Sequence, residues 1–182
     1  MPVPVTITPY QVQIQADRRL VFQYLTAFGV GGPGSRESSK VLRDEGNRKL
    51  VEFHLEVRGL FGGTKRVRTV EWVTLNEPES IDFEGVTGPL PLLLDRFELE
   101  EDGGCTVLRY RSTVGAHGWV FGWPIAMLIA RPMVKRHMRA HLAEVKERVE
   151  ARARRSRVYP QRPCLHEAPP EPVPAEVIDA AK

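Results

Sequence analysis

The run RPMVKRHMRAHLAEVKERVEARARR at residues 131–155 has the spacing of one long amphipathic helix. Its apolar side chains recur at intervals of four, four, three and four residues, so they share one helix face. These side chains are Val134, Met138, Leu142, Val145 and Val149. A helix from Met133 to about Arg155 would be roughly 33 Å long at about 1.5 Å per residue. Such a helix is long enough to lie across a sheet of six or seven strands.

Most of the chain before this helix consists of short runs in which apolar and polar residues alternate, as in strands with one buried face. The clearest run is 49–58, where every second residue from Val51 to Val57 is apolar and most residues between them are charged. The other runs of this kind are 3–15, 64–75, 80–86, 92–100 and 106–114. We therefore predict an α+β fold, in which an antiparallel sheet of six to seven strands packs its apolar face on the C-terminal helix and leaves its charged face in water.

The region between the first two runs predicts a short helix and a loop. Asp17 can cap a helix that ends near Thr26, because its carboxylate accepts hydrogen bonds from N–H groups of the first turn. Residues 29–39 are rich in Gly, Pro and Ser, which is typical of a loop. Residues 29–34 match G-x-G-x-x-G, but a dinucleotide-binding loop follows a strand and opens a helix. Here a helix precedes the match and Pro33 lies inside it, so we expect no dinucleotide and no other cofactor.

Length and composition indicate one globular domain with a tail. The chain has 182 residues, of which 42% are hydrophobic and 27% charged, as is usual for a soluble domain. Cys105 and Cys164 show no spacing that indicates a metal or disulfide framework. The first basic residue is Arg18, so the N-terminus lacks the positive start of a signal peptide. We therefore expect a cytoplasmic location.

Charge and composition change toward the C-terminus. Residues 131–162 carry 11 basic and 3 acidic side chains, net +8, whereas the whole chain has a net charge of +3. Such a segment could attract nucleic acid or anionic lipid, but a solvated helix face also explains it. It lacks the interleaved aromatic residues that stack on bases, so we expect no nucleic-acid partner. Six prolines follow Arg157 within 25 residues. We predict a domain over 1–155 and a Pro-rich, disordered tail over 156–182.

The stretch STVGAHGWVFGWPIAMLIA, residues 112–130, contains no charged side chain. Its length approaches the roughly 20 apolar residues that a membrane-spanning helix needs, but three glycines and Pro124 argue against a span. Two alternatives remain open. The apolar part caps an interior cavity or packs in a homodimer interface. In the other alternative Trp119, Phe121 and Trp123 make a peripheral membrane contact, helped by the basic residues that follow.

Two stretches of the chain resemble one protein superfamily. Residues 14–25, IQADRRLVFQYL, are similar to the strand-to-helix opening of the START-like, or SRPBCC, helix-grip superfamily. Residues 131–134, RPMV, are similar to the start of its closing helix. Within the superfamily the chain resembles the polyketide cyclase/dehydrase and lipid-transport group over residues 3–155. Residues 28–34 depart from this group, which often has a Trp-containing segment at that place.

The resemblance implies a curved sheet wrapped around the long C-terminal helix, with a hydrophobic small molecule held in a cavity between them. The implied function is binding or carriage of a lipid-, quinone- or polyketide-like molecule. The alternative is an enzyme of the polyketide cyclase/dehydratase type that uses the same cavity, because fold alone does not decide between the two. The residues that we predict to line the cavity are Phe53, Leu55, Val57, Phe83, Phe97, Leu99, Tyr110, Met133 and Met138. The other interpretation is that these side chains fill a closed core.

Few residues suggest catalysis or metal binding. Tyr110 offers a hydroxyl that could orient a polar atom of the ligand. Glu71 or Asp95 could point into the cavity as a general base with a raised pKa, although for Asp95 we favour a salt bridge at a strand end. His137 and His141 share a helix face at the spacing of a zinc pair. Their neighbours are basic and no third ligand is evident, so we expect no metal.

Overall fold

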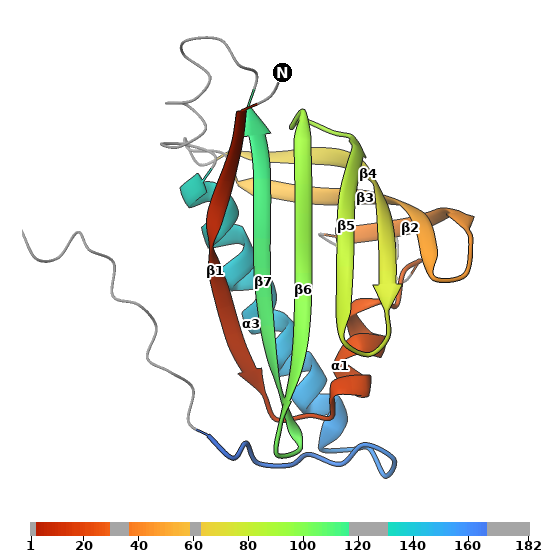
Figure 1. Cartoon of the computed structure of the whole chain (residues 1–182), viewed down its shortest axis with the longest axis vertical. Helices are drawn as coiled ribbons and strands as arrows, with labels where there is room; N and C mark the ends of the chain where they lie inside the picture. The colour runs from red at the N-terminus through yellow and green to blue at the C-terminus, as the bar shows by residue number, and fades with distance from the viewer. Residues whose placement is uncertain (1–2, 30–36, 59–62, 117–130, 167–182) are drawn as a thin grey trace, which may run out of the picture.

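In the part of the chain that the structure describes, one antiparallel sheet carries two helices on one of its faces (Figure 1). This computed structural model describes residues 3–29, 37–58, 63–116 and 131–166. The elements in these ranges are β1 (Val3–Ile14), α1 (Arg18–Leu25), β2 (Glu37–Asp44), β3 (Arg48–Arg58), β4 (Thr64–Asn76), β5 (Ser80–Thr87), β6 (Leu92–Asp102), β7 (Cys105–Ala116) and α3 (Arg131–Ala153). The seven strands are ordered β1-β7-β6-β5-β4-β3-β2 in the described part of the chain. The predicted α+β helix-grip fold is therefore confirmed.

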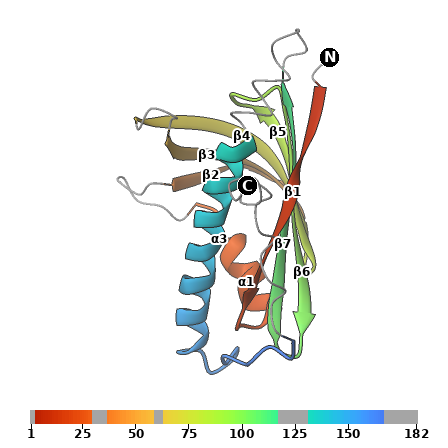
Figure 2. The same ribbon diagram turned by 90° about the vertical axis from the view of Figure 1, so that its left-hand side faces the viewer.

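The sheet curves around α3 (Figure 2). Strands β1, β7 and β6 run alongside the helix, whereas β4, β3 and β2 bend across its N-terminal half. Helix α1 lies between the C-terminal half of α3 and the sheet. The two ends of α3 thus have different neighbours, a helix at one end and the bent part of the sheet at the other.

Local sequence signals account for α1. Asp17 caps the helix, because its Oδ1 accepts a hydrogen bond from the Arg19 N–H at 2.8 Å. The helix ends where the Thr26 N–H donates to the Phe22 carbonyl at 3.0 Å. Its buried side chains are Leu20, Val21 and Phe22. The predicted helix from Asp17 to about Thr26 is confirmed.

Strand β1 keeps its apolar residues on the helix side by means of a bulge. Val5 and Ile7 are buried, and so is Ile14, although an unbroken alternation would put Ile14 on the other face. The register with β7 shifts between Ile7 and Tyr10, a stretch that includes Pro9. One extra residue in a strand reverses the facing of all residues after it. The bulge therefore lets both halves of β1 contribute to the core.

The predicted apolar stripe of α3 faces the sheet. Leu142, Val145 and Val149 are buried in the main hydrophobic cluster, and Met138 packs against it. Val134, one turn earlier, packs against a second, smaller cluster. Each buried aliphatic side chain of this kind contributes about 1.5–3 kcal/mol relative to an exposed one. The stripe thus holds α3 to β1 and, in its C-terminal half, to α1.

The sequence does not predict strand β2, which begins inside the loop predicted for 29–39 and continues to Asp44. The structure pairs Ser39 with Phe53 and Val41 with Val51, so that β2 forms the edge of the sheet beside β3. Val41 is the β2 residue that packs against the main cluster. An edge strand with so few apolar side chains shows almost no alternation of apolar and polar residues in its sequence. Its pairing with β3 in a hairpin, which closes between Asp44 and Lys49, makes it a strand.

The two cysteines correct a second prediction, because Cys105 and Cys164 form a disulfide with a Cα–Cα distance of 5.0 Å. Their separation of 59 residues gives no local signal. The β6–β7 hairpin places Cys105 at the end of the sheet where the chain returns after α3. Residues 156–166, which we call the C-terminal strap, cross beneath this hairpin (Figure 1). Residues 156–166 of the predicted tail are thus tied to β7 at Cys164, and residues 167–182 lie outside the described ranges.

Candidate ligand-binding site

Five aromatic rings form a continuous row across the face of the sheet that the helices cover. The row runs from Phe28, after α1, through Phe53 of β3, Phe83 of β5 and Phe97 of β6 to Tyr110 of β7. Successive ring centroids are 5.9, 6.2, 5.7 and 5.2 Å apart. These separations lie within the range of favourable aromatic pairs. Successive rings meet edge-to-face or tilted, and together they form an apolar surface on the face that the helices cover.

The structure brings most of the predicted lining residues together. Phe97, Leu99 and Tyr110 are buried in the main cluster. Three others are partly buried and pack against it, namely Phe53, Phe83 and Met138. Leu55 is half-buried farther along β3. The structure places Val57 in β3 and Met133 in the first turn of α3, and the positions of these two side chains are outside its described part.

Four polar side chains lie on the same face of the sheet, next to the end of the aromatic row. We call Glu71 of β4, Asp95 of β6, and Tyr110 and Ser112 of β7 the polar cluster. Glu71, Tyr110 and Ser112 are buried and Asp95 is mostly buried. Asp95 stands directly opposite Ser112 in the register of β6 and β7. Glu71 accepts a hydrogen bond on Oε1 from the Thr69 hydroxyl at 2.7 Å.

Two buried atoms of the polar cluster make no hydrogen bond of good geometry with any described residue. They are Asp95 Oδ1 and Ser112 Oγ. Buried polar atoms are nearly always paired, because leaving one unpaired costs about 1–3 kcal/mol. The Asp95 oxygen is an acceptor and the Ser112 hydroxyl can act as a donor or an acceptor. A ligand oxygen that carries a proton has the hydrogen-bonding capacity that complements these two atoms.

Burial controls the ionisation of the polar cluster. It raises the pKa of Asp95 from the ordinary value of 3.8 to about 6, although the nearby hydroxyls of Ser112 and Tyr110 favour the charged form. Burial also raises the pKa of Glu71; the Thr69 hydrogen bond opposes this rise and the charge of Asp95 adds to it. The pKa of Tyr110 rises as well, mainly through burial and then through the charge of Asp95. Asp95 can therefore gain or lose a proton close to neutral pH.

The polar cluster separates two apolar clusters. Along β6, Asp95 lies between Phe97 of the main cluster and Leu93, which packs against the smaller one. Along β7, Ser112 lies between Tyr110 and Val114 in the same way. In both neighbouring strands the inward-facing side chains thus change from apolar to polar and back to apolar, at positions that pair with each other. Buried titratable groups in such a position are costly to the fold and mark candidate functional sites.

Part of this cluster could be identified from the sequence. Glu71, Asp95 and Tyr110 were named there, whereas Ser112 was missed and the preferred role for Asp95 was wrong. Asp95 makes no ion pair with any residue that the structure describes. The signal was present, because Asp95 falls in phase with the apolar residues Leu93 and Phe97. A polar residue at a position where the strand alternation would place an apolar one indicates a side chain that faces the interior.

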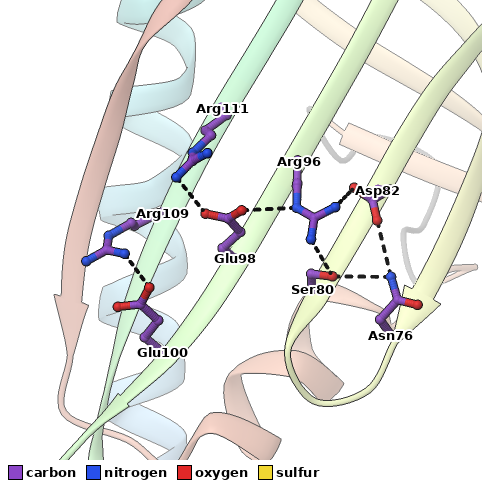
Figure 3. Close-up of polar contacts among 8 residues, drawn as sticks. All are labelled: Asn76, Ser80, Asp82, Arg96, Glu98, Glu100, Arg109 and Arg111. Carbon is purple, nitrogen blue, oxygen red and sulfur yellow. Dashed lines mark hydrogen bonds and ion pairs between the residues drawn. The ribbon is translucent and has the colours of Figure 1, made fainter.

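The opposite face of the sheet carries a network of ion pairs, as predicted for a wet face (Figure 3). Arg96 binds Asp82 at 2.9 Å and Glu98 at 3.1 Å, and Arg111 binds Glu98 at 3.2 Å. Exposed pairs of this kind contribute about 0–1 kcal/mol each. The network therefore keeps this face solvated and leaves the helix-covered face as the candidate site.

Metal-binding geometry is not found in the described ranges. No three His, Cys, Asp or Glu side chains there are grouped so that they could hold a metal ion. His54 instead contacts Glu52, with 3.0 Å between His54 Nε2 and Glu52 Oε1, and Glu52 also binds Arg68. His137 and His141 lie on α3 and are half-buried.

Several predictions concern residues outside the described ranges. Residues 117–130, which include Trp119, Phe121 and Trp123, are among them, and so is most of the glycine-rich match at 29–34. None of the described helices is both long and apolar enough to cross a membrane.

A curved antiparallel sheet closed by a C-terminal helix, with an aromatic row and buried polar groups on the face that the helices cover, defines a helix-grip protein. Residues 6–150 match the family described as polyketide cyclase/dehydrase and lipid transport, and the chain belongs to this family. Family and fold together support the binding of a hydrophobic ligand. No curated protein matches the chain in sequence.

Solved structures share this fold at low sequence identity. The Zhui aromatase/cyclase from Streptomyces sp. R1128 is 15% identical with a TM-score of 0.69, over 86% of this chain and 98% of that chain. The protein TTHA0849 from Thermus thermophilus is 17% identical with a TM-score of 0.65, over 82% and 99%. A START superfamily protein from Mycobacterium smegmatis is 17% identical with a TM-score of 0.62, over 81% and 99%. At these identities the likeness establishes the fold alone.

Proposed function

We propose that the protein binds or carries a hydrophobic small molecule that contains rings and at least one hydroxyl or carbonyl oxygen. The observation that carries this proposal is the polar cluster, which lies between two apolar clusters and beside the aromatic row. Of the ligands expected from the sequence, quinone- and polyketide-like molecules fit a row of aromatic rings better than a straight acyl chain. Apolar burial supplies the affinity, about 25 cal/mol per Å². The unpaired oxygens of the polar cluster orient the ligand.

Binding of the neutral fluorophore N-phenyl-1-naphthylamine tests this proposal. The measurement is a fluorescence titration of the wild type, of Phe83→Leu and of Leu94→Ala. Phe83 belongs to the aromatic row, whereas Leu94 is an exposed residue of β6, 43% accessible. We expect Phe83→Leu to weaken binding about five- to tenfold, because a ring contact is lost, and Leu94→Ala to leave it unchanged. Equal affinity in all three proteins would place the probe elsewhere.

A second candidate function is catalysis of the dehydratase type, and the pKa of Asp95 favours it. A carboxylate with a pKa of about 6 can accept the proton from a carbon next to a carbonyl. The resulting carboxylic acid can return that proton to a β-hydroxyl group, which leaves as water, so that an enone forms. The Tyr110 phenol stays protonated and can donate a hydrogen bond to the enolate oxygen.

The β-hydroxy ketone 4-hydroxy-4-phenylbutan-2-one is a suitable probe for this chemistry. We expect its dehydration to accelerate with an apparent pKa near 6, and we expect Asp95→Asn to abolish the acceleration while probe binding is retained. An acceleration that survives in Asp95→Asn would remove the assigned role of this carboxylate. No acceleration in the wild type would leave binding or carriage as the function.

A homodimer, a peripheral membrane contact through Trp119, Phe121 and Trp123, and a cytoplasmic location remain proposals from the sequence. The first two depend on residues 117–130. Analytical ultracentrifugation and sedimentation with anionic vesicles are the measurements that test them.

A further inference from the structure

The disulfide closes a covalent ring that contains both walls of the candidate site. It joins Cys105, the first residue of β7, to Cys164 of the C-terminal strap. The chain between them includes all of β7, with Tyr110 and Ser112, and all of α3. The helix and the strand that face the ligand are therefore covalently tied together at the end of the sheet where α3 ends.

The β6–β7 hairpin is shaped to receive the strap. Gly103 and Gly104 have φ values of +65° and +116°, which favour glycine. A Cβ on Gly103 would lie 2.1 Å from Leu165 Cγ, and one on Gly104 would lie 2.8 Å from Arg162 Cδ. A side chain at either position would collide with the Leu165 or Arg162 side chain of the strap. The close approach of the strap is thus built into both segments.

Polar contacts hold the strap to the ends of β6 and β1. The ring of His166 contacts Asp102, with 2.8 Å between Nδ1 and Oδ1, and the His166 N–H donates to Asp102 Oδ2 at 3.2 Å. Gln13 donates to the His166 carbonyl at 2.8 Å, and Gln161 donates to Gln15 at 2.9 Å. All of these contacts are exposed to solvent, where such bonds are individually weak. The covalent bond is therefore the main constraint on the strap.

The two sulfur atoms differ in accessibility, which sets the route of reduction. Cys105 is fully buried and Cys164 is half-buried. A thiolate of a dithiol reductant would attack Cys164 Sγ, break the S–S bond and release the Cys105 thiolate. The second thiol of the reductant then displaces Cys164 and closes a cyclic disulfide. In total the protein gains two electrons and two protons, and the reductant loses them.

We infer that Cys105 and Cys164 form a reversible redox site, which we call the clasp, that holds the C-terminal end of α3 against the sheet. With the bond intact, the last turns of α3 stay packed against β1 and α1; with the bond reduced, the strap detaches and these turns open more often. Opening at this end also loosens the hold on a bound molecule, a consequence that rests on the proposed function. A reducing cytoplasm would favour the open dithiol form, and an oxidising environment the clasped form.

Hydrogen–deuterium exchange of the full chain tests the clasp without a ligand. The samples are the protein oxidised with glutathione disulfide, the same protein reduced with dithiothreitol, and the variant Cys105→Ser/Cys164→Ser. We expect amides in 145–153 and 156–166 to exchange at least tenfold faster in the second and third samples. Amides of β3 and β4 serve as an internal control for global destabilisation and should change much less. The double variant should not respond to dithiothreitol.

Two results would overturn the clasp. One is equal exchange in 145–153 for the oxidised and reduced protein. The other is the presence of two free thiols after treatment with glutathione disulfide. Asp102→Asn, which removes the carboxylate charge and one of the two acceptor oxygens that face His166 but keeps both cysteines, should remain close to the oxidised protein. Fast exchange in Asp102→Asn would show that the polar contacts, and not the disulfide, hold the strap.

The release rate of N-phenyl-1-naphthylamine separates this inference from the proposed function. We expect reduction to accelerate release about tenfold. Failure of the probe to bind in either state would contradict the proposed function, whereas the exchange data would still decide the clasp. Binding with the same release rate in both states would refute the link between the redox site and the ligand.

Discussion

Asp95 is the residue whose position is hardest to explain by stability alone. It lies in phase with Leu93 and Phe97 on the covered face of the sheet, where an apolar residue would pack without cost. One of its carboxylate oxygens has no partner in the described part of the chain, and burial raises its pKa to about 6. A group that opposes folding at neutral pH suggests a role in binding or chemistry.

Replacing this carboxylate tests its energetic cost. Because the folded-state pKa is above the ordinary 3.8, the free energy of unfolding is largest below about pH 4 and falls as pH rises through 6. The full effect is at most about 3 kcal/mol, at about 1.4 kcal/mol per pKa unit. We expect Asp95→Asn to raise the free energy of unfolding at pH 8 by about 1–2 kcal/mol and to change it little at pH 4.

Guanidinium unfolding at the two pH values provides the measurement. Asp82→Asn is the matched control, because Asp82 is a partly exposed carboxylate paired with Arg96 on the wet face. We expect its effect to stay within about 0.5 kcal/mol at pH 8. A variant Asp95→Asn that is less stable than wild type at pH 8 would show that the carboxylate is satisfied and not costly.

Gly103 tests the fit between the hairpin and the strap. Gly103→Ala should lower the free energy of unfolding by about 2 kcal/mol, because it combines an unfavourable positive φ with a clash against Leu165. Gly46→Ala is the matched control, since Gly46 has a φ of +82° with nothing within 4 Å of the added Cβ. Chemical unfolding should show a smaller loss for Gly46→Ala, of about 1 kcal/mol. Equal losses would mean that the strap does not press on Gly103.

At the scale of elements, local patterns predict most of the fold. The stripe on α3, the cap at Asp17 and the alternation in β3 each depend on residues close in sequence, and the structure confirms all three. The β1 bulge depends instead on pairing with a strand that is distant in sequence, and β2 has too few apolar residues for an alternation to show. The strap is a third case. Its proline content predicts disorder, whereas a disulfide between two cysteines 59 residues apart in the sequence ties it to β7.

The attachment of α3 to the sheet gives a prediction at this scale. Leu142 is fully buried in the main cluster, so Leu142→Ala removes apolar contacts and leaves a cavity. We expect the free energy of unfolding to fall by about 2–5 kcal/mol in chemical denaturation. Leu42→Ala on the edge strand, where the side chain is 44% accessible, should cost less than about 1 kcal/mol. Similar losses in both variants would contradict the packing of α3 against the sheet.

At the scale of the whole molecule, the candidate site depends on contacts between distant parts of the chain. Four of the elements contribute one ring each to the aromatic row, and Glu71 meets Asp95 only because β4, β5 and β6 are neighbours. The sequence could name several of these residues but could not bring them together. For the same reason the sequence does not identify Ser112 as a residue of the site, because its place there follows only from its register opposite Asp95.

The covalent ring should also stabilise the molecule as a whole. A loop of this length corresponds to a loss of unfolded-state entropy equivalent to about 4 kcal/mol at 25 °C. We expect Cys105→Ser/Cys164→Ser to lower the free energy of unfolding by about 2–4 kcal/mol relative to the oxidised protein, as measured in guanidinium without reductant. The reduced wild type should match the double variant. A double variant as stable as the oxidised protein would contradict a constraining role of the bond.

The central claim is that a ring-containing ligand lies on the aromatic row with its oxygen at Asp95. The most direct test is NMR titration of the ¹³C-labelled Asp95 carboxyl group, without ligand and with saturating 1-naphthol or naphthalene. We predict shifts of the Phe83 and Tyr110 ring signals with both compounds. We also predict a lower Asp95 pKa with 1-naphthol than with naphthalene, because only the hydroxyl can donate to the charged carboxylate. Unchanged ring signals and the same Asp95 pKa in all three samples would contradict the account.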